Sequence, residues 1–275
     1  MRTNLKIIDH SVTKEEFYLD YDNELDYYIT RPVPNNLPDY YESDNYISHT
    51  DSTTNFQDKL YQFVKKINLQ HKLKLTNQYA NNNKRILDIG AGTGDFLKEA
   101  ELNGWSISGV EPNPKARNLA SSKGIQLVPA LENFDDPTFD VITLWHVLEH
   151  LPNIEEQIKK IKSLLSPSGT LIIAVPNYKS FDANYYKEYW AAYDVPRHLY
   201  HFSRNTIKRI FSKYSISLIR TKPMYFDAYY VSLLSEKYKT GKSNYIKAFI
   251  IGSLSNLRAI LNKEHSSLIY ILKKD

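Results

Sequence analysis

The spacing of hydrophobic residues changes repeatedly along the chain. From about residue 85 onward, short runs of apolar residues alternate with segments in which apolar residues recur every three or four positions. Short runs are typical of buried strands, and the longer spacing is typical of helices that bury one face. Strands and helices that alternate in this way favour a parallel sheet covered by helices. We therefore predict an α/β fold with a mostly parallel sheet.

The same pattern gives the bounds of the predicted elements. Gly104 and Gly124 follow two of the helices, and Ser203 has the side chain of an N-cap residue. The predicted helices cover residues 56–79, 95–103, 113–123, 152–165 and 203–214. The seven predicted strands of the sheet lie at residues 86–89, 105–111, 125–128, 139–145, 170–175, 216–221 and 267–273.

Several segments lie outside this alternation. Residues 1–50 are expected to form an N-terminal accessory segment with two or three short strands. Residues 51–275 then form the main domain, which two inserts interrupt. One insert covers about residues 176–202, after the fifth strand, and the other covers about 223–266, between the sixth and seventh strands. We expect the second insert to be helical.

A glycine-rich turn follows the first strand of the sheet, with glycines at Gly90, Gly92 and Gly94. Glycine adopts backbone angles that a Cβ forbids and lets a ligand approach the main chain closely. The dinucleotide-binding pattern G-x-G-x-x-G requires a third glycine where this chain has Asp95. A carboxylate there would repel a pyrophosphate but would tolerate a cationic ligand, such as the sulfonium and ammonium groups of S-adenosylmethionine.

Two further blocks follow at the ends of later strands. Glu111 lies about twenty residues beyond the first glycine, where doubly wound folds place a carboxylate that accepts hydrogen bonds from a ribose diol. The fourth strand ends in an aromatic and histidine-rich turn that contains Trp145 and His146. Because ligands bind at the carboxyl ends of strands in open α/β sheets, we expect these residues to surround one cofactor.

These blocks, at residues 87–94, 110–112 and 140–150, resemble those of the class I S-adenosylmethionine-dependent methyltransferases. The resemblance covers roughly residues 80–178 and implies a Rossmann-like sheet with S-adenosylmethionine as the cofactor. It places the adenine near residues 129–132. The cofactor-binding residues that it implies are Asp88, Gly90, Ala91, Gly92, Gly94, Asp95, Phe96, Glu111, Pro112, Ala130, Leu131, Leu144, Trp145 and His146.

The first insert carries the candidate catalytic residues. Its segment 194–201 resembles the same insert in methyltransferases similar to those that methylate ubiquinone precursors. If the acceptor is a hydroxyl, a base must take its proton, and we expect His198 to do so, with His146 as a second candidate. We expect Arg197 to hold an anionic substrate group and Asp194 to orient one of these residues. The alternative is a rigid lid in which Asp194 and Arg197 pair and the histidines are hydrogen-bonded.

The composition of the chain limits which nucleic-acid, metal and membrane partners are expected. A net charge of +4 over 275 residues does not indicate nucleic-acid binding. The chain has no cysteine, which excludes disulfides and thiolate-bound zinc, and we expect no metal. Residues 30–43 resemble the end of a zinc ribbon without its cysteines. The apolar stretches are too short for stable membrane insertion, so a cytoplasmic protein is expected.

The acceptor remains open at this point. We expect a small molecule that is methylated on a hydroxyl oxygen. The tyrosine-rich segments 185–193 and 225–238 fit either an aromatic acceptor pocket or a homodimer interface. Two other functions are compatible with parts of the pattern. One is a cofactor-binding protein without catalysis, and the other is a nicotinamide-dependent oxidoreductase, against which Asp95 argues.

Overall fold

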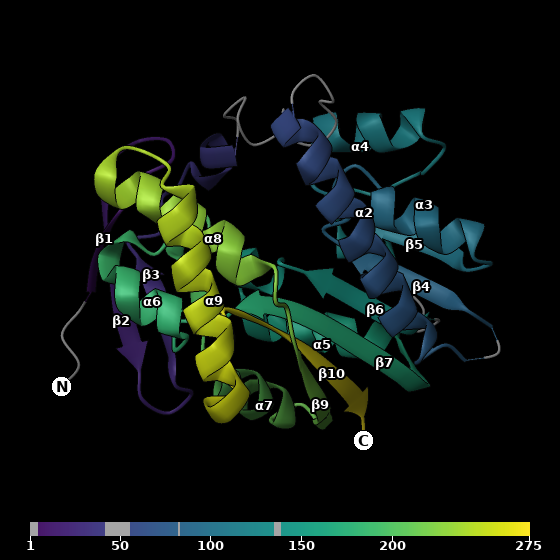
Figure 1. Cartoon of the computed structure of the whole chain (residues 1–275). Helices are drawn as coiled ribbons and strands as arrows, with labels where there is room; N and C mark the ends of the chain where they lie inside the picture. Colours follow the sequence, from purple (N-terminus) through teal and green to yellow (C-terminus); the bar gives the residue numbers. More distant parts are fainter. Residues whose placement is uncertain (1–4, 42–55, 82, 135–138) are drawn as a thin grey trace. The chain divides into compact units, whose positions relative to one another are not determined.

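The computed structural model describes residues 5–41, 56–81, 83–134 and 139–275, and side chains in the first part of the 56–77 helix are not described. The chain divides into two compact units (Figure 1). The N-terminal unit comprises described residues within 1–42, 146–154 and 173–271. The nucleotide unit, named for the predicted cofactor residues that it carries, comprises those within 43–145, 155–172 and 272–275. The predicted boundary near residue 50 lies outside the described residues.

Three parallel strands form the centre of the nucleotide unit. β4 (Arg85–Ile89) pairs in parallel with β5 (Ser106–Val110) on one side and with β6 (Phe139–Trp145) on the other. Every residue of β6 is buried, as expected for a strand that is covered on both faces. The carboxyl ends of β4, β5 and β6 therefore meet at one edge of the unit, which is where the predicted cofactor residues follow each strand.

The complete sheet has the strand order β5-β4-β6-β7-β10-β9. Its remaining strands are β7 (Leu165–Pro176), β9 (Ile216–Pro223) and β10 (Ser267–Lys274). The fold is α/β with a mostly parallel, Rossmann-like sheet, as the sequence predicts. However, among the described residues this sheet has six strands rather than seven, because the predicted strand at 125–128 does not form.

The missing strand is reduced to a single bridge. Val128 donates from its N–H to the Gly109 carbonyl and accepts from the Glu111 N–H, at 3.0 and 2.9 Å. The next rung of a parallel ladder would join the Ala130 N–H to the Glu111 carbonyl. Instead, Ala130 donates to the Asn133 side chain and Arg117 donates to the Glu111 carbonyl. Both ladder groups are therefore satisfied elsewhere, and the strand ends after one residue.

The helices of the nucleotide unit begin and end close to their predicted bounds. α4 has Asn113 as its N-cap, whose side chain accepts from the N–H groups of Lys115 and Ala116, and Pro114 follows at the first helical position. α3 begins directly after the glycine turn. The helices are α2 (Phe56–Asn77), α3 (Asp95–Leu102), α4 (Pro114–Ser122) and α5 (Ile154–Leu164).

The N-terminal unit contains a second sheet, which is antiparallel. β1 (Leu5–Ile8), β2 (Glu16–Asp22) and β3 (Tyr27–Arg31) form a meander, which confirms the predicted short strands. Alternate side chains on it are buried, including Ile7, Phe17 and Leu19. β8 (Tyr200–Phe202), which belongs to the first predicted insert, adds to β3 as the fourth strand. The sequence pattern did not predict this pairing.

The second predicted insert is helical, as expected, whereas the first contains only short helices and the strand β8. The second insert forms α8 (Asp227–Thr240) and α9 (Tyr245–Asn262), which pack side by side (Figure 1). A Cβ on Gly252 would lie 3.0 Å from the Ala228 carbonyl oxygen, so the two helices approach closely there. The other helices of the unit are α6 (Phe181–Tyr186) and α7 (Arg204–Ser212). Short 3-10 helices in the described residues include η1 (Leu37–Tyr41), η2 (Leu131–Asn133), η3 (Leu148–His150), η4 (Lys187–Tyr189) and η5 (Ala191–Tyr193).

Candidate functional site

The glycine turn after β4 has the left-handed backbone that its sequence requires. Gly90, Gly92 and Gly94 have φ values of 71°, 56° and 76°. Other residues adopt such angles only with strain. Among the described residues, a Cβ built on Gly92 would meet no atom within 4 Å, so the turn borders open space. The half-buried main chain at Gly92 therefore borders open space beside the first turn of α3, where a helix start presents unpaired N–H groups.

Glu111 is fixed beside this turn. Its Oε2 accepts a hydrogen bond from the Gly92 N–H, and its Oε1 accepts one from the Asn113 N–H, each at 2.9 Å. The carboxylate is therefore held at the end of β5, facing the glycine turn at the end of β4. A carboxylate has about four lone-pair directions, so two such bonds leave acceptor capacity for a ribose diol. The structure thus brings together the two features on which the cofactor prediction depends.

Asp88 precedes the turn, inside β4. It is buried and accepts a hydrogen bond from the Thr143 hydroxyl of β6 at 2.6 Å. Burial raises the pKa of the Asp88 carboxyl to about 7, although the Thr143 hydrogen bond and the charge of Lys72 act in the opposite direction. Asp88 therefore joins two strands beneath the turn.

The surroundings of Asp95 differ from what we expected from the sequence, because two lysines of the protein pair with its carboxylate. Its carboxylate oxygens lie 2.7 Å from the Lys65 ammonium and 2.8 Å from the Lys123 ammonium. Burial raises the pKa of Asp95, but these two lysines outweigh it and hold the pKa below its usual value. The negative charge that we expected to face a cationic ligand is thus balanced by two cations of the protein itself.

Trp145 ends β6 and packs edge-on against Phe96, with ring centroids 5.8 Å apart. The Lys72 ammonium lies 4.8 Å from the centroid of the Trp145 ring. The indole Nε1 is buried and has no hydrogen-bond partner in the described structure. Of the other predicted cofactor residues, those buried are Ala91, Leu131 and Leu144, whereas Pro112 is exposed and Ala130 is half-buried.

His146 belongs to the N-terminal unit and has a left-handed φ of 58°. Its Nε2 lies 3.0 Å from Asp227 Oδ2, and its Nδ1 lies 3.4 Å from Glu149 Oε1. Burial lowers the pKa of this imidazole, but the Asp227 and Glu149 carboxylates outweigh burial and raise the pKa to about 10. At neutral pH both ring nitrogens therefore carry protons. In this geometry His146 has no lone pair with which to act as the predicted base.

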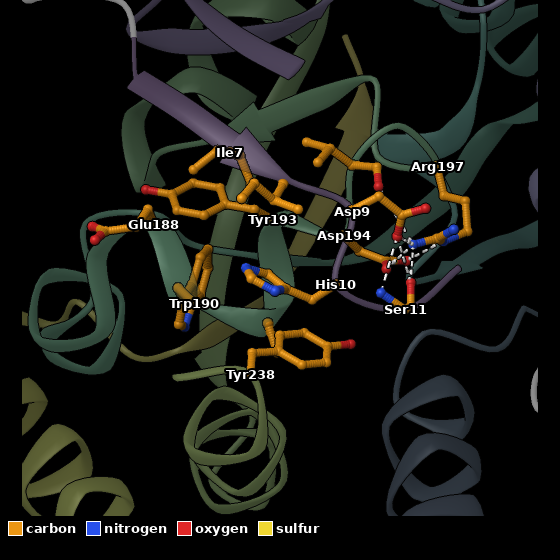
Figure 2. Close-up of a pocket in the computed structure, with 13 residues that line it drawn as sticks. Ile7, Asp9, His10, Ser11, Glu188, Trp190, Tyr193, Asp194, Arg197 and Tyr238 are labelled. Atoms are coloured by element: carbon orange, nitrogen blue, oxygen red, sulfur yellow. Dashed lines mark hydrogen bonds and ion pairs between the residues drawn. The ribbon is translucent and has the colours of Figure 1, made fainter. Parts of the chain in front are cut away.

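Arg197 is buried within the N-terminal unit, where it binds acids of the protein (Figure 2). Its guanidinium lies 2.7 Å from Asp194 Oδ1 and 3.0 Å from Asp9 Oδ1, and it also donates to the Ser11 hydroxyl and the Tyr40 carbonyl. These contacts fit the alternative interpretation, in which Arg197 and Asp194 pair to hold the segment rigid. Sequence reasoning missed Asp9, because no local pattern relates residues 188 positions apart.

A small pocket adjoins this ion pair (Figure 2). The pocket is lined by Tyr193 and Tyr238, one from each tyrosine-rich segment, and by Trp190 of the first insert. The His10 ring stacks on Tyr238, with ring centroids 5.0 Å apart. The two segments therefore meet, at least in part, around an aromatic pocket of the N-terminal unit. Tyr225 and Tyr230 instead point to solvent, with 56% and 59% of their surface exposed.

His198 lies in a cluster of histidines. Its Nδ1 donates to the Ala192 carbonyl at 2.9 Å, and its ring packs edge-on against His150, with centroids 4.6 Å apart. The Leu199 N–H donates to the Glu149 carbonyl at 2.8 Å, which joins the segment around His198 to η3. Burial and the neighbouring His198 lower the pKa of His150 to about 4, so His150 is neutral at physiological pH.

One group of side chains in the described part of the chain has the composition of a metal site. Glu149, His150 and His198 each offer one ligand atom, and these three atoms lie within 4.8 Å of one another. The sequence prediction of no metal considered the absence of cysteines but not this combination. The signal was present in the histidines at 150 and 198, yet their proximity depends on the pairing of two distant segments.

Comparison with known proteins gives three consistent results. Residues 62–219 match a family model described as a methyltransferase domain. The chain is 32% identical over 105 residues to an uncharacterized methyltransferase of Alkaliphilus oremlandii (strain OhILAs), covering 34% of this chain and 46% of that protein. It is 30% identical over 108 residues to a ubiquinone biosynthesis O-methyltransferase of Actinobacillus pleuropneumoniae serotype 5b (strain L20), with the same two coverages. The chain spans less than half the length of these relatives.

A solved structure agrees with the fold over most of the chain. Magnesium protoporphyrin IX methyltransferase from Synechocystis PCC 6803 with bound SAH superposes with a TM-score of 0.57 at 16% identity. The match covers 86% of this chain and 97% of that one. At this identity the likeness concerns the fold. No helix in the described part of the chain is both long enough and apolar enough to cross a membrane.

Proposed function

This chain belongs to the methyltransferase-domain family, and from that premise we propose that it transfers a methyl group from S-adenosylmethionine to a small-molecule acceptor. The observation that best supports this cofactor is the hydrogen bond between the glycine turn and Glu111. A carboxylate held at 2.9 Å from the Gly92 N–H, beside an open glycine turn, suits a ligand that has both ribose hydroxyls and a polar chain.

The residues present fit this cofactor. Gly92 borders open space, Glu111 retains acceptor capacity, and Trp145 has a buried indole N–H without a partner. We propose that Glu111 accepts from the ribose hydroxyls and that the aromatic side chains of Phe96 and Trp145 pack beside the ligand. The sulfonium of S-adenosylmethionine supplies an already activated methyl group. The protein then contributes mainly position and exclusion of water.

We propose a hydroxyl oxygen as the acceptor. Support comes from relatives such as the ubiquinone biosynthesis O-methyltransferase of Actinobacillus pleuropneumoniae, although the match covers only 34% of this chain. A hydroxyl must lose a proton as the methyl group arrives. His198 is the residue of the first insert that retains a nitrogen for this purpose, because its Nδ1–H is already donated to the Ala192 carbonyl. Arg197 is better explained as a residue that holds the segment.

Calorimetric titration of S-adenosylhomocysteine, with NADH in parallel, tests the cofactor. We expect micromolar binding of S-adenosylhomocysteine and no binding of NADH. Glu111→Ala is expected to weaken S-adenosylhomocysteine binding by about 1–3 kcal/mol, the loss of hydrogen bonds to a charged acceptor. Glu101→Ala, which removes an exposed acid of α3, is the matched control and should leave affinity unchanged.

The outcomes separate the alternatives. Binding of NADH alone would indicate an oxidoreductase. Unchanged affinity in Glu111→Ala would remove the ribose assignment. Binding of S-adenosylhomocysteine without methyl transfer from labelled S-adenosylmethionine to any member of a panel of phenols and alcohols would indicate a cofactor-binding protein without O-methyltransferase activity.

A further inference from the structure

Glu149 and His150 lie in η3, and His198 lies in the first insert, all within the N-terminal unit. Their three ligand atoms lie within 4.8 Å of one another. We propose that these residues bind one divalent transition-metal ion, and that zinc matches their donor set best. Three observations carry the proposal: a buried carboxylate that accepts no hydrogen bond from the described residues, two histidines oriented by backbone carbonyls, and the close spacing of the three ligand atoms.

The Glu149 carboxylate is buried without the hydrogen bonds that burial requires. Only 1% of the side chain is exposed, and neither Oε1 nor Oε2 has a hydrogen-bond donor among the described residues. His146 Nδ1 lies 3.4 Å from Oε1, within the range of an ion pair but not in hydrogen-bond geometry. Burying a carboxylate in this way is costly unless a cation or donors compensate. The His146 imidazolium compensates part of this charge, and a bound metal ion would also give the carboxylate the direct partner that it lacks.

The hydrogen bond of His150 places its proton on Nδ1 and leaves Nε2 as the nitrogen that a metal could use. Its Nδ1 lies 3.0 Å from the Arg197 carbonyl oxygen, and this oxygen can only accept a hydrogen bond. Nδ1 must therefore carry the proton, and in the neutral ring the lone pair is on Nε2. The Tyr41 hydroxyl also lies 3.2 Å from this Nδ1 and donates to the same carbonyl.

His198 shows the same arrangement. Its Nδ1 lies 2.9 Å from the Ala192 carbonyl oxygen, which again requires a proton on Nδ1. Metal-binding histidines almost always donate their second ring N–H to a carboxylate or a backbone carbonyl, which fixes the tautomer and the orientation of the ring. Both histidines of the cluster therefore have the second hydrogen bond that a metal ligand typically has. His201, the neighbouring histidine, instead places its Nε2 2.9 Å from the Thr30 hydroxyl and is not part of the set.

The geometry requires only a small closure. Tetrahedral ligands at zinc bond lengths of about 2.0–2.1 Å lie roughly 3.4 Å apart. The ligand atoms here, which are separated by up to 4.8 Å, must approach by roughly 1.4 Å at most.

The donor set selects the ion. Two imidazole nitrogens and one carboxylate oxygen suit zinc and other first-row transition metals, whereas magnesium and calcium prefer oxygen ligands throughout. Three protein ligands also match catalytic rather than structural zinc sites, which keep a fourth position for water or substrate. The proposed site would thus leave one coordination position of the ion for water or substrate.

An ion at this position would also refine the proposed function. A hydroxyl bound to a zinc ion loses its proton at a much lower pH than a free one. The hydroxyl proton would then pass to water, and His198 would hold the ion rather than act as the base. This second step rests on the proposed function, whereas the metal site itself does not.

Zinc binding to the full chain tests the site directly. The protein is stripped with a chelator, titrated with zinc chloride in a calorimeter, and analysed for metal after dialysis. We expect one zinc ion per chain, and Co²⁺ in its place should give the intense visible absorption of a four- or five-coordinate ion. Glu149→Gln and His198→Ala should each weaken zinc binding by about 100-fold or more, since even changes beside the ligands cost 10–100-fold.

His71→Ala is the matched control. His71 lies exposed on α2, so this substitution removes a surface histidine and leaves the cluster intact. It should leave zinc affinity unchanged. Circular dichroism of each metal-free variant shows whether it has folded. If a variant fails to fold, the unmodified chain still decides the question. The absence of a tight 1:1 zinc complex, or zinc binding that His71→Ala abolishes, would overturn the proposal. Titration with S-adenosylhomocysteine on the same samples shows separately whether the cofactor proposal stands.

Discussion

Replacing Asp9 by Asn tests the structural interpretation of Arg197. Asp9 and Arg197 are 1% and 2% exposed, and Asp9 Oδ1 lies 3.0 Å from Arg197 Nη2. The Asp9 carboxylate also accepts hydrogen bonds from the N–H groups of Ser11, Val12 and Thr13 at 2.9–3.2 Å. The substitution preserves the size of the side chain and one acceptor oxygen. It removes the negative charge and replaces the other acceptor by a donor.

The magnitude follows from the burial of the pair. Breaking a buried ion pair by removing one partner typically costs 3–5 kcal/mol, because the remaining charge stays buried. Here Asp194 still lies 2.7 Å from the guanidinium and compensates part of that charge. We therefore expect the lower end of the range, about 3 kcal/mol of unfolding free energy. This is a large fraction of the total stability of a typical domain.

The effect of pH has a definite sign. Burial raises the pKa of the Asp9 carboxyl, but hydrogen bonds from Thr13 and Arg197 outweigh it and hold the pKa well below the ordinary value of 3.8. A carboxyl with a lowered folded pKa stabilises the protein above its unfolded pKa and loses that contribution as pH falls through the folded value. The difference between the unmodified chain and Asp9→Asn should therefore be constant near neutral pH and should shrink below about pH 3.8.

Urea unfolding, followed by far-ultraviolet circular dichroism and tryptophan fluorescence, measures the loss. Glu16→Gln is the matched control, because it removes an acid from an exposed ion pair with Lys6 on the same sheet. This control should be indistinguishable from the unmodified chain, since exposed pairs contribute little. If Asp9→Asn is no more destabilising than Glu16→Gln, Arg197 is not held by this pair, and its role in binding an anionic substrate would have to be reconsidered.

Two further changes test the surroundings of the candidate sites. Because the folded pKa of His146 is raised to about 10, its contribution to stability is fully present below pH 6.5 and is lost as pH rises through 10. In Asp227→Asn, the His146 ring proton signals in NMR should titrate at a lower pH, and an unchanged titration would refute the ion pair. Gly94→Ala should destabilise the chain by about 1–3 kcal/mol, because φ is +76° and the new Cβ would lie 3.1 Å from a buried isoleucine. Gly124→Ala, at φ +83° without such crowding, should cost less in thermal melts, and an equal cost would exclude crowding.

The nucleotide unit could be predicted from the sequence because its information is local. A short apolar run predicts β4, and three glycines predict the turn after it. A second run with strand alternation predicts β5 and places Glu111 at its end. Parallel strands bring their carboxyl ends together, so the contact between Glu111 and Gly92 follows from topology. The strand predicted at residues 125–128 fails for an equally local reason, but one that depends on side-chain hydrogen bonds rather than on periodicity.

The N-terminal unit could not be predicted to the same depth. Alternation of apolar residues indicates β1, β2 and β3, but it does not say that residues 200–202 will be the next strand of their sheet. The Asp9–Arg197 pair depends on that arrangement. The predicted catalytic segment contains the right kinds of residue, yet whether each one holds the fold or offers a reactive atom depends on partners outside the segment, such as Asp9, which lies 188 positions from Arg197.

Arg197 and His198 are adjacent in the sequence but have different roles because their side chains have different partners. The Arg197 side chain is held by Asp9 and Asp194, while its own carbonyl oxygen accepts the His150 Nδ1–H. The ion pair therefore positions the atom that sets the tautomer of His150, and with it the nitrogen proposed to bind zinc. It follows that Asp9→Asn should weaken zinc binding even where the protein remains folded, although Asp9 contributes no ligand. Equal zinc affinity in folded Asp9→Asn would mean that the cluster keeps its geometry without the pair, and that the backbone around residue 197 is fixed by β8 and the neighbouring loop instead.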